Sequence, residues 1–278
     1  MNNIMGIEYG RGCLRTAING GPALAPAEIK KMFPNVDWTT VIADPFNAEE
    51  CARDRFGENY KIQKKIYAAT PHERHIMIGG DHSVNYGHFT ALANRNATQD
   101  MCLIYIDAHL DIHTPESAQR QASGAPHGTN VRALMGDGDK RWLSLQNNAP
   151  VLTPDRVFYI GTRSYEDAEL EFVHTNNIYI RTPKQLQNQS DWNDTVHEIR
   201  QKIGDRPFVV SFDFDALDPT YFGDVLVPAP DGITVAAAEY FIREFDDAVS
   251  FEFVEYAPSG DKNCTQIAKH LIGLVVNQ

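Results

Sequence analysis

The sequence has 278 residues and a formal net charge of −12, from 25 Lys and Arg against 37 Asp and Glu. This acidic balance excludes a nucleic-acid-binding protein held by a basic surface. Hydrophobic residues make up 42% and charged residues 22% of the chain, which is ordinary globular composition rather than the signature of disorder.

The four cysteines lie far apart and include no Cys-x-x-Cys pair, as is typical of a reduced protein; they are Cys13, Cys51, Cys102 and Cys264. The first residues lack a basic start followed by an apolar stretch, and no segment approaches the ~18 apolar residues that a membrane span requires. We therefore expect a cytoplasmic protein that is neither exported nor inserted into a membrane.

Short apolar runs rich in β-formers recur at 75–80, 101–109, 156–163, 206–215 and 250–258. Helix-like stretches are found at 26–32, 89–95, 167–175, 192–203, 235–245 and 265–276. Continuous rather than alternating hydrophobicity predicts strands that are covered on both faces, and the alternation of strand and helix favours a doubly wound α/β protein with a parallel sheet. Because no repeat and no long linker divides the chain, we predict a single domain over residues 1–278. The polar segment 115–128 directly follows a strand end, where such sheets place their ligands.

Three predicted strand ends carry clustered acids and histidines, in the segments GGDHS (79–83), DAHLD (107–111) and SFDFDALDP (211–219). In an extended segment residues two apart share a face, so Asp107, His109 and Asp111 can converge on one point. Asp213 and Asp215 obey the same rule. Carboxylates gathered in this way repel one another unless cations neutralise them.

Carboxylate and imidazole ligands without a thiolate suit Mn²⁺, with Zn²⁺, Fe²⁺ and Co²⁺ as alternatives, and a metal pair can activate one water. A single Asp at a strand end is more often a helix cap or a turn former, and we keep that interpretation for Asp218. Asp81 is interpreted as a ligand, a cap or a partner that orients a ligand. Six residues together favour a metal centre, namely His82, Asp107, His109, Asp111, Asp213 and Asp215.

These three motifs, in this order, resemble the ureohydrolases, the arginase and agmatinase family of binuclear manganese enzymes, over about residues 75 to 260. The resemblance implies a three-layer α/β/α arginase-like fold with an eight-stranded, mostly parallel sheet. It also implies two Mn²⁺ per chain, bridged by Asp107 and Asp213. The first metal would be held by His82, Asp107, Asp111 and Asp213, and the second by His109, Asp107, Asp213 and Asp215.

Two further positions match the family. His127 in SGAPHGTN corresponds to the active-site histidine that passes a proton to the departing amine. Glu255 in FEFVEYAPSG corresponds to the glutamate that holds the substrate guanidinium. A buried glutamate at a strand end needs a cationic partner in any case, and a planar guanidinium supplies one. The implied reaction is hydrolysis of a guanidinium to urea and an amine, with Asp107, His127 and Glu255 as the catalytic residues.

The loop DIHTPESAQRQASGAPHG after Asp111 is closer to the arginase pattern than to the shorter agmatinase loop. Where arginases hold the α-carboxylate of arginine this chain has His113 and Ser123, and Glu166 stands at the acid that contacts the α-amino group. The loop also looks about three residues longer, and Asp231 replaces a usual glycine. We therefore expect a substrate with an arginine side chain. Free arginine and arginine within a peptide remain open, with agmatine and guanidino acids as alternatives.

Two other classes of protein remain. A deacetylase relative would use one zinc and a tandem His pair, which this chain lacks. A pseudoenzyme would keep the metal ligands for binding or assembly alone. Because relatives assemble as trimers or hexamers, the resemblance implies a homo-oligomer whose size the sequence leaves open. The expected partner is a guanidino substrate, with no nucleic acid and no membrane.

Overall fold

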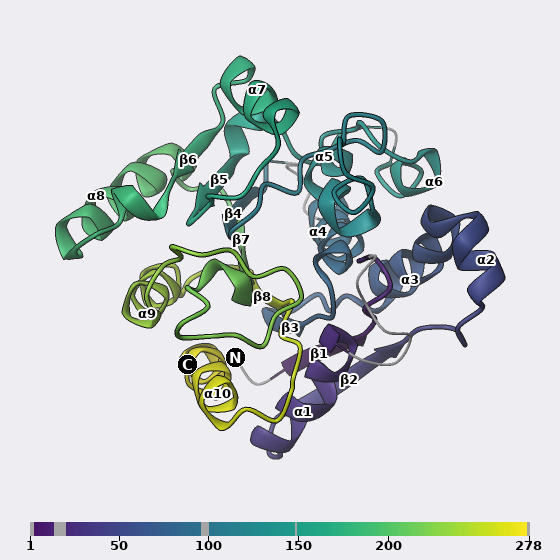
Figure 1. The fold of residues 1–278 in the computed structure, drawn as a ribbon, viewed down its shortest axis with the longest axis horizontal. Helices are drawn as coiled ribbons and strands as arrows, with labels where there is room; N and C mark the ends of the chain where they lie inside the picture. Colours follow the sequence, from purple (N-terminus) through teal and green to yellow (C-terminus); the bar gives the residue numbers. More distant parts are fainter. Residues whose placement is uncertain (1–2, 14–20, 96–99, 148, 277–278) are drawn as a thin grey trace.

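A sheet of eight strands forms the centre of the computed structural model, which describes residues 3–13, 21–95, 100–147 and 149–276 (Figure 1). The strands are β1 (Asn3–Glu8), β2 (Asp37–Ile42), β3 (His75–Ile78), β4 (Cys102–Ile106), β5 (Val157–Ile160), β6 (Tyr179–Arg181), β7 (Phe208–Asp213) and β8 (Ser250–Val254). Their order is β2-β1-β3-β8-β7-β4-β5-β6, and every neighbouring pair is parallel. The predicted arginase-like α/β fold is confirmed, with a sheet that is parallel throughout.

Helices join the strands and cover the sheet. The α-helices are α1 (Ala25–Met32), α2 (Ala48–Arg53), α3 (Arg55–Ala69), α4 (Asn85–Arg95), α5 (Asn130–Leu134), α6 (Lys140–Leu143), α7 (Asp167–Thr175), α8 (Gln189–Ile203), α9 (Val235–Glu244) and α10 (Lys262–Val276). Short 3₁₀ turns are η1 (Gly21–Leu24), η2 (His82–Val84), η3 (Pro126–Thr129), η4 (Pro154–Arg156), η5 (Pro183–Gln185) and η6 (Phe214–Ala216). No helix in these described ranges has the length and apolar character to cross a membrane.

Helices lie on both faces of the sheet, so the central strands are buried on both sides. Helices α1, α8, α9 and α10 follow one face, and α3, α4, α5 and α7 follow the other (Figure 1). Alternate residues of β4 divide between these layers, since Ile104 and Ile106 pack with the first set and Leu103 and Tyr105 with the second. This double coverage explains why the strand runs read as continuously apolar.

The five predicted strands correspond to β3, β4, β5, β7 and β8, and the six predicted helices to α1, α4, α7, α8, α9 and α10. The hydrophobic pattern missed β1, a buried strand whose short apolar run is interrupted by Gly6, β2, an edge strand whose residues are largely exposed, and the short, half-buried β6. It missed the short helices α2, α5 and α6 as well. It also missed α3, because that helix buries the polar residues Glu58, Asn59 and Gln63 and so shows weak apolar periodicity. The single domain over residues 1–278 stays a prediction.

The strand order brings the three motifs together. Strands β3, β8, β7 and β4 are consecutive neighbours in the sheet, and all point the same way. Their carboxyl ends therefore meet at one edge, where His82 follows β3, Asp107 follows β4, Asp213 ends β7 and Glu255 follows β8. Residues far apart in the sequence are thus delivered to one site.

Candidate active site

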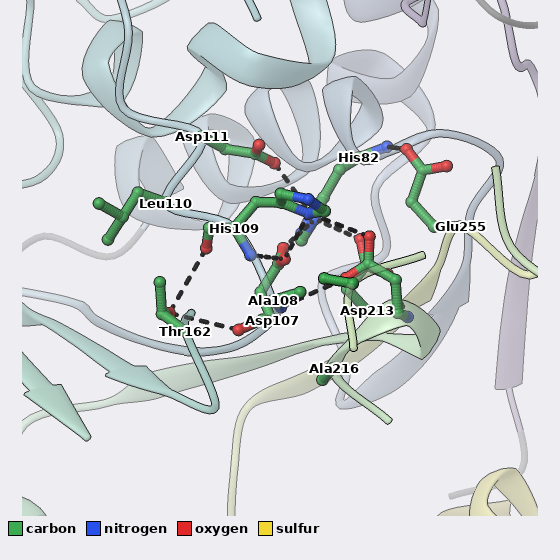
Figure 2. Close-up of polar contacts among 12 residues, drawn as sticks. His82, Asp107, Ala108, His109, Leu110, Asp111, Thr162, Asp213, Ala216 and Glu255 are labelled. Carbon is green, nitrogen blue, oxygen red and sulfur yellow. Dashed lines mark hydrogen bonds and ion pairs between the residues drawn. The ribbon is translucent and has the colours of Figure 1, made fainter. Parts of the chain in front are cut away.

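Three carboxylates surround one nitrogen of His82 (Figure 2). His82 Nδ1 lies 2.9 Å from Asp107 Oδ2, 3.1 Å from Asp213 Oδ2 and 3.5 Å from Asp111 Oδ2. All four residues are buried. The ligand atoms of His82, Asp107 and Asp111 lie within 4.8 Å of one another, close enough to hold a metal ion.

A second group forms around His109, whose Nδ1 lies 3.1 Å from Asp215 Oδ2 and 3.5 Å from Asp107 Oδ1. Asp107 therefore offers one oxygen to each group. The side chain of His109 is 21% exposed while that of Asp107 is fully buried, so the second group lies nearer to solvent. The structure brings all six predicted ligands together in two adjoining groups that share Asp107.

The electrostatics of the cluster fit divalent cations. Asp107 Oδ2 is buried and makes no hydrogen bond, although it faces His82 Nδ1. Burial, followed by repulsion from Asp107, raises the pKa of Asp111 to about 7. Burial, followed by repulsion from Asp215, raises the pKa of Asp213 well above its usual value. Bound cations would remove this repulsion and engage the unpaired oxygen.

Neighbouring groups orient the ligands. His82 Nε2 lies 2.9 Å from the Ser211 hydroxyl oxygen, and its ring stacks on Tyr105 at a centroid distance of 4.3 Å, so Nδ1 is directed at the carboxylates. The Tyr105 hydroxyl donates to Asp111 Oδ2 at 2.8 Å. Asp111 has a positive φ of 50°, a strained conformation of the kind that clusters at functional sites.

Glu255 lies beside this cluster, and one of its two carboxylate oxygens makes no hydrogen bond. Oε1 accepts the backbone N–H of His82 at 2.8 Å, while Oε2 is buried without a hydrogen bond (Figure 2). Burial, followed by repulsion from Asp81, raises the pKa of Glu255 well above its usual value. The residue also has a positive φ of 62°. An orphaned carboxylate oxygen held in a strained backbone is poised for a cationic ligand.

His127 lies in η3 and has a fixed orientation. Its Nδ1 is 3.1 Å from the carbonyl oxygen of Gly12, and since a carbonyl only accepts, Nδ1 carries the hydrogen and Nε2 carries a lone pair. Burial lowers the pKa of His127 to about 4, which keeps the ring neutral at pH 7. The N–H of Gly12 donates to Asp81 Oδ2 at 2.7 Å. Asp81 also caps η2, and it lies outside both ligand groups.

One pocket adjoins the exposed side of the site and is lined by His109, Asp111, His127, Asp213, Asp215 and Glu255. It holds about 790 Å³ of empty space, counting the open solvent at its mouth. Its lining joins His109, His127 and Glu255 to the loop that follows Asp111 and to the start of α7. The predicted active-site loop over 115–128 therefore borders the metal cluster.

The predicted substrate-binding residues of that loop contact one another. His113 Nε2 lies 3.2 Å from Glu169 Oε2 and 3.5 Å from Glu166 Oε2. His113 Nδ1 is 3.0 Å from the Ser117 hydroxyl oxygen, and Ser123 lies beside the Glu166 carboxylate, whose pKa it helps to lower. Burial lowers the pKa of His113, but the carboxylates of Glu169 and Glu166 outweigh burial and raise it overall.

Three contributors escaped the sequence analysis. Ser211 stands two residues before Asp213 on the same strand face, so alternation could have identified it as a partner of the ligand cluster. Glu169 forms a capping box with Glu166, a pattern that three-residue spacing reveals. Arg120 lines the pocket from within the loop that follows Asp111, and no local pattern marks it. Asp231, at the usual glycine position, has a positive φ of 60°.

Comparisons with known proteins agree with this architecture. The arginase family profile matches residues 4–276. The arginase of Glaciozyma antarctica is 30% identical over 212 residues, which cover 71% of this chain and 59% of that protein. The arginase of Bacillus subtilis is 24% identical over 293 residues, which cover 98% of this chain and 97% of that protein.

Solved structures share the fold. The arginase of Bacillus cereus superposes with a TM-score of 0.84 at 19% identity, covering 99% of this chain and 97% of that one. The agmatine ureohydrolase of Thermoplasma volcanium gives a TM-score of 0.70 at 20% identity, covering 99% of this chain and 88% of that one. The profile match, the relatives and the buried His and Asp groups agree, and the chain belongs to the arginase family of metal-dependent ureohydrolases.

Proposed function

We propose that this protein is a binuclear manganese enzyme that hydrolyses the guanidinium of arginine, free or within a peptide, to urea and ornithine. The observation that carries the proposal is the position of Asp107, which offers one oxygen to each ligand group, beside the unpaired Oε2 of Glu255. Hard oxygen and imidazole ligands without a thiolate favour manganese. Manganese bound by these residues would lower the pKa of a water molecule and so make it nucleophilic enough to attack the guanidinium carbon.

The remaining chemistry belongs to the chain itself. Glu255 Oε2 accepts hydrogen bonds from the guanidinium nitrogens, while Oε1 stays on the backbone of His82 and fixes the carboxylate plane. His127, whose Nδ1 hydrogen is bound to Gly12, accepts a proton from the attacking water on Nε2 and then passes it to the departing amine. Consumption of one water therefore yields urea and a protonated amine.

The test uses purified protein stripped with a chelator and reloaded with manganese, zinc or buffer alone. We expect two equivalents of manganese per chain and urea release from L-arginine or from an end-blocked arginyl peptide. A single equivalent of zinc with deacetylase activity would favour the rival enzyme class, and bound metal with no urea from any guanidino compound would favour a pseudoenzyme. The homo-oligomer and the cytoplasmic location stay predictions.

A further inference from the structure

The pocket is strongly acidic. Six carboxylates line it, namely Asp111, Glu166, Glu169, Asp213, Asp215 and Glu255. With divalent cations on Asp111, Asp213 and Asp215, the remaining acids Glu166, Glu169 and Glu255 would still attract a guanidinium and repel any carboxylate that the same substrate carries. A substrate with charges at both ends therefore needs a cation in the pocket, away from Glu255.

The two residues at the family's carboxylate-binding positions face other side chains of the protein, although His113 Nε2 is buried without a hydrogen bond. Both ring nitrogens of His113 face other side chains, Nδ1 at Ser117 and Nε2 at Glu169 and Glu166. Ser123 lies beside the Glu166 carboxylate, whose pKa it helps to lower. Since acids surround both residues, neither offers a free donor in a positive environment to a substrate carboxylate.

Arg120 offers a positively charged donor group, which His113 and Ser123 do not. Among the described residues that line the pocket it is the one Arg, and no Lys joins it. Its side chain is exposed, and its guanidinium has no hydrogen bond or ion pair to any residue in the described ranges. A guanidinium presents a planar set of donors that match a carboxylate bidentately.

The loop backbone holds Arg120 at this place. The N–H of Gln119 donates to Glu166 Oε2 at 2.6 Å, and the backbone of Arg120 also contacts the Glu166 carboxylate. The carbonyl oxygen of Arg120 accepts the N–H of Gly124 at 3.2 Å. Glu166 thus ties the loop that follows Asp111 to the start of α7 and presents the Arg120 side chain to the pocket.

We infer that Arg120 determines specificity by binding a carboxylate at the end of the substrate opposite the guanidinium. This inference rests on the proposed function and narrows its substrate class to guanidino compounds with a free carboxylate. Free arginine, an arginine at a peptide carboxyl terminus and guanidino acids belong to this class. Agmatine, argininamide and an arginine inside a peptide do not.

The experiment compares two pairs of substrates that differ in the far-end carboxylate: L-arginine with L-argininamide, and 4-guanidinobutyrate with agmatine. Urea release is measured for the manganese-loaded wild-type protein and for Arg120→Gln and Arg120→Lys. Arg53→Gln is the matched control, because Arg53 is an exposed arginine of α2 outside the pocket lining. The Arg53→Gln substitution removes one positive charge from the surface, as Arg120→Gln does.

We expect the wild-type protein to favour the carboxylate member of each pair in kcat/KM by about tenfold or more, the scale of a hydrogen bond between charged groups. Arg120→Gln should abolish this preference by raising KM for the carboxylate substrates, with argininamide turnover unchanged. Arg120→Lys should retain part of the preference, and Arg53→Gln should retain all of it. The preference should also shrink in high salt, since Arg120 is exposed.

An equal loss on both members of a pair in Arg120→Gln, or an unchanged preference, would overturn the inference and leave the proposed function standing. If the wild-type protein releases urea from neither member of either pair, but does so from an end-blocked arginyl peptide, the role of Arg120 is overturned and the proposed function stands. Urea from none of these five substrates would overturn the proposed function itself, and the role of Arg120 with it.

Discussion

Replacement of Glu255 by Gln separates catalysis from folding at this site. The amide keeps an oxygen that can accept the backbone N–H of His82, which lies 2.8 Å from Oε1 in the native protein. The amide nitrogen then takes the place of the unpaired Oε2. A donor would face the donors of the substrate guanidinium, so the main attraction for the substrate is lost.

The size of the effect follows from the charge-assisted contact. A hydrogen bond to a charged group contributes about 1.5 to 3 kcal/mol, which corresponds to roughly a 10- to 150-fold fall in kcat/KM. The loss should appear mainly in KM, because the guanidinium is already charged in the ground state.

Although Glu255→Gln should lower kcat/KM, it should raise the folding stability of the protein without metal or substrate. The pKa of Glu255 is raised in the folded protein, so the native state holds this proton more tightly than the unfolded chain does. Stability without metal or substrate therefore falls as pH rises above the unfolded value of 4.5. Glu255→Gln lacks this loss, so its melting temperature relative to that of the wild type should rise as pH increases above 4.5.

The assay combines urea release at varied substrate concentration, metal content per chain and thermal melting. Glu239→Gln is the matched control, since Glu239 lies on the surface of α9 bound to Arg243 and His270. An unchanged KM with full metal content would refute the assigned role of Glu255. A fall in metal content together with activity would show instead that the carboxylate acts through His82.

Three further predictions concern the metal cluster and His127. Asp107→Asn should abolish urea release and lower manganese below two equivalents, because one residue serves both ligand groups; normal turnover at full occupancy would contradict the shared role. His127→Ala should retain both metals while turnover falls about 10²-fold, the scale of a general acid or base, and undiminished turnover would make the histidine a bystander. Manganese should raise the melting temperature more at pH 8 than at pH 6, because metal must displace the proton that Asp111 holds with its pKa of about 7. At about 100 times the dissociation constant the stabilisation is about 2.7 kcal/mol, and a shift that shrinks as pH rises would contradict the proton displacement.

The local pattern of the sequence was sufficient to predict the candidate ligands. Asp107, His109 and Asp111 alternate directly after an apolar run, and Asp213 and Asp215 repeat that spacing, so each set shares one face of an extended segment. Buried strands also reveal themselves locally, because double coverage requires apolar residues at successive positions. The pattern failed at the exposed edge strand β2 and at the polar buried face of α3, where burial does not follow hydrophobicity, and it also missed the short buried strand β1.

Tertiary structure decided how the acids and histidines are used. The contact between Glu255 and the backbone of His82 joins residues 173 positions apart and exists because β8 lies beside β3 in the sheet. In the same tertiary structure Asp81 binds the backbone of Gly12 and lies outside the ligand groups. Glu166 likewise contacts His113 and the backbone of the loop that follows Asp111. Local spacing carries no information about such pairings, since they depend on which strand ends and loops the sheet order makes neighbours.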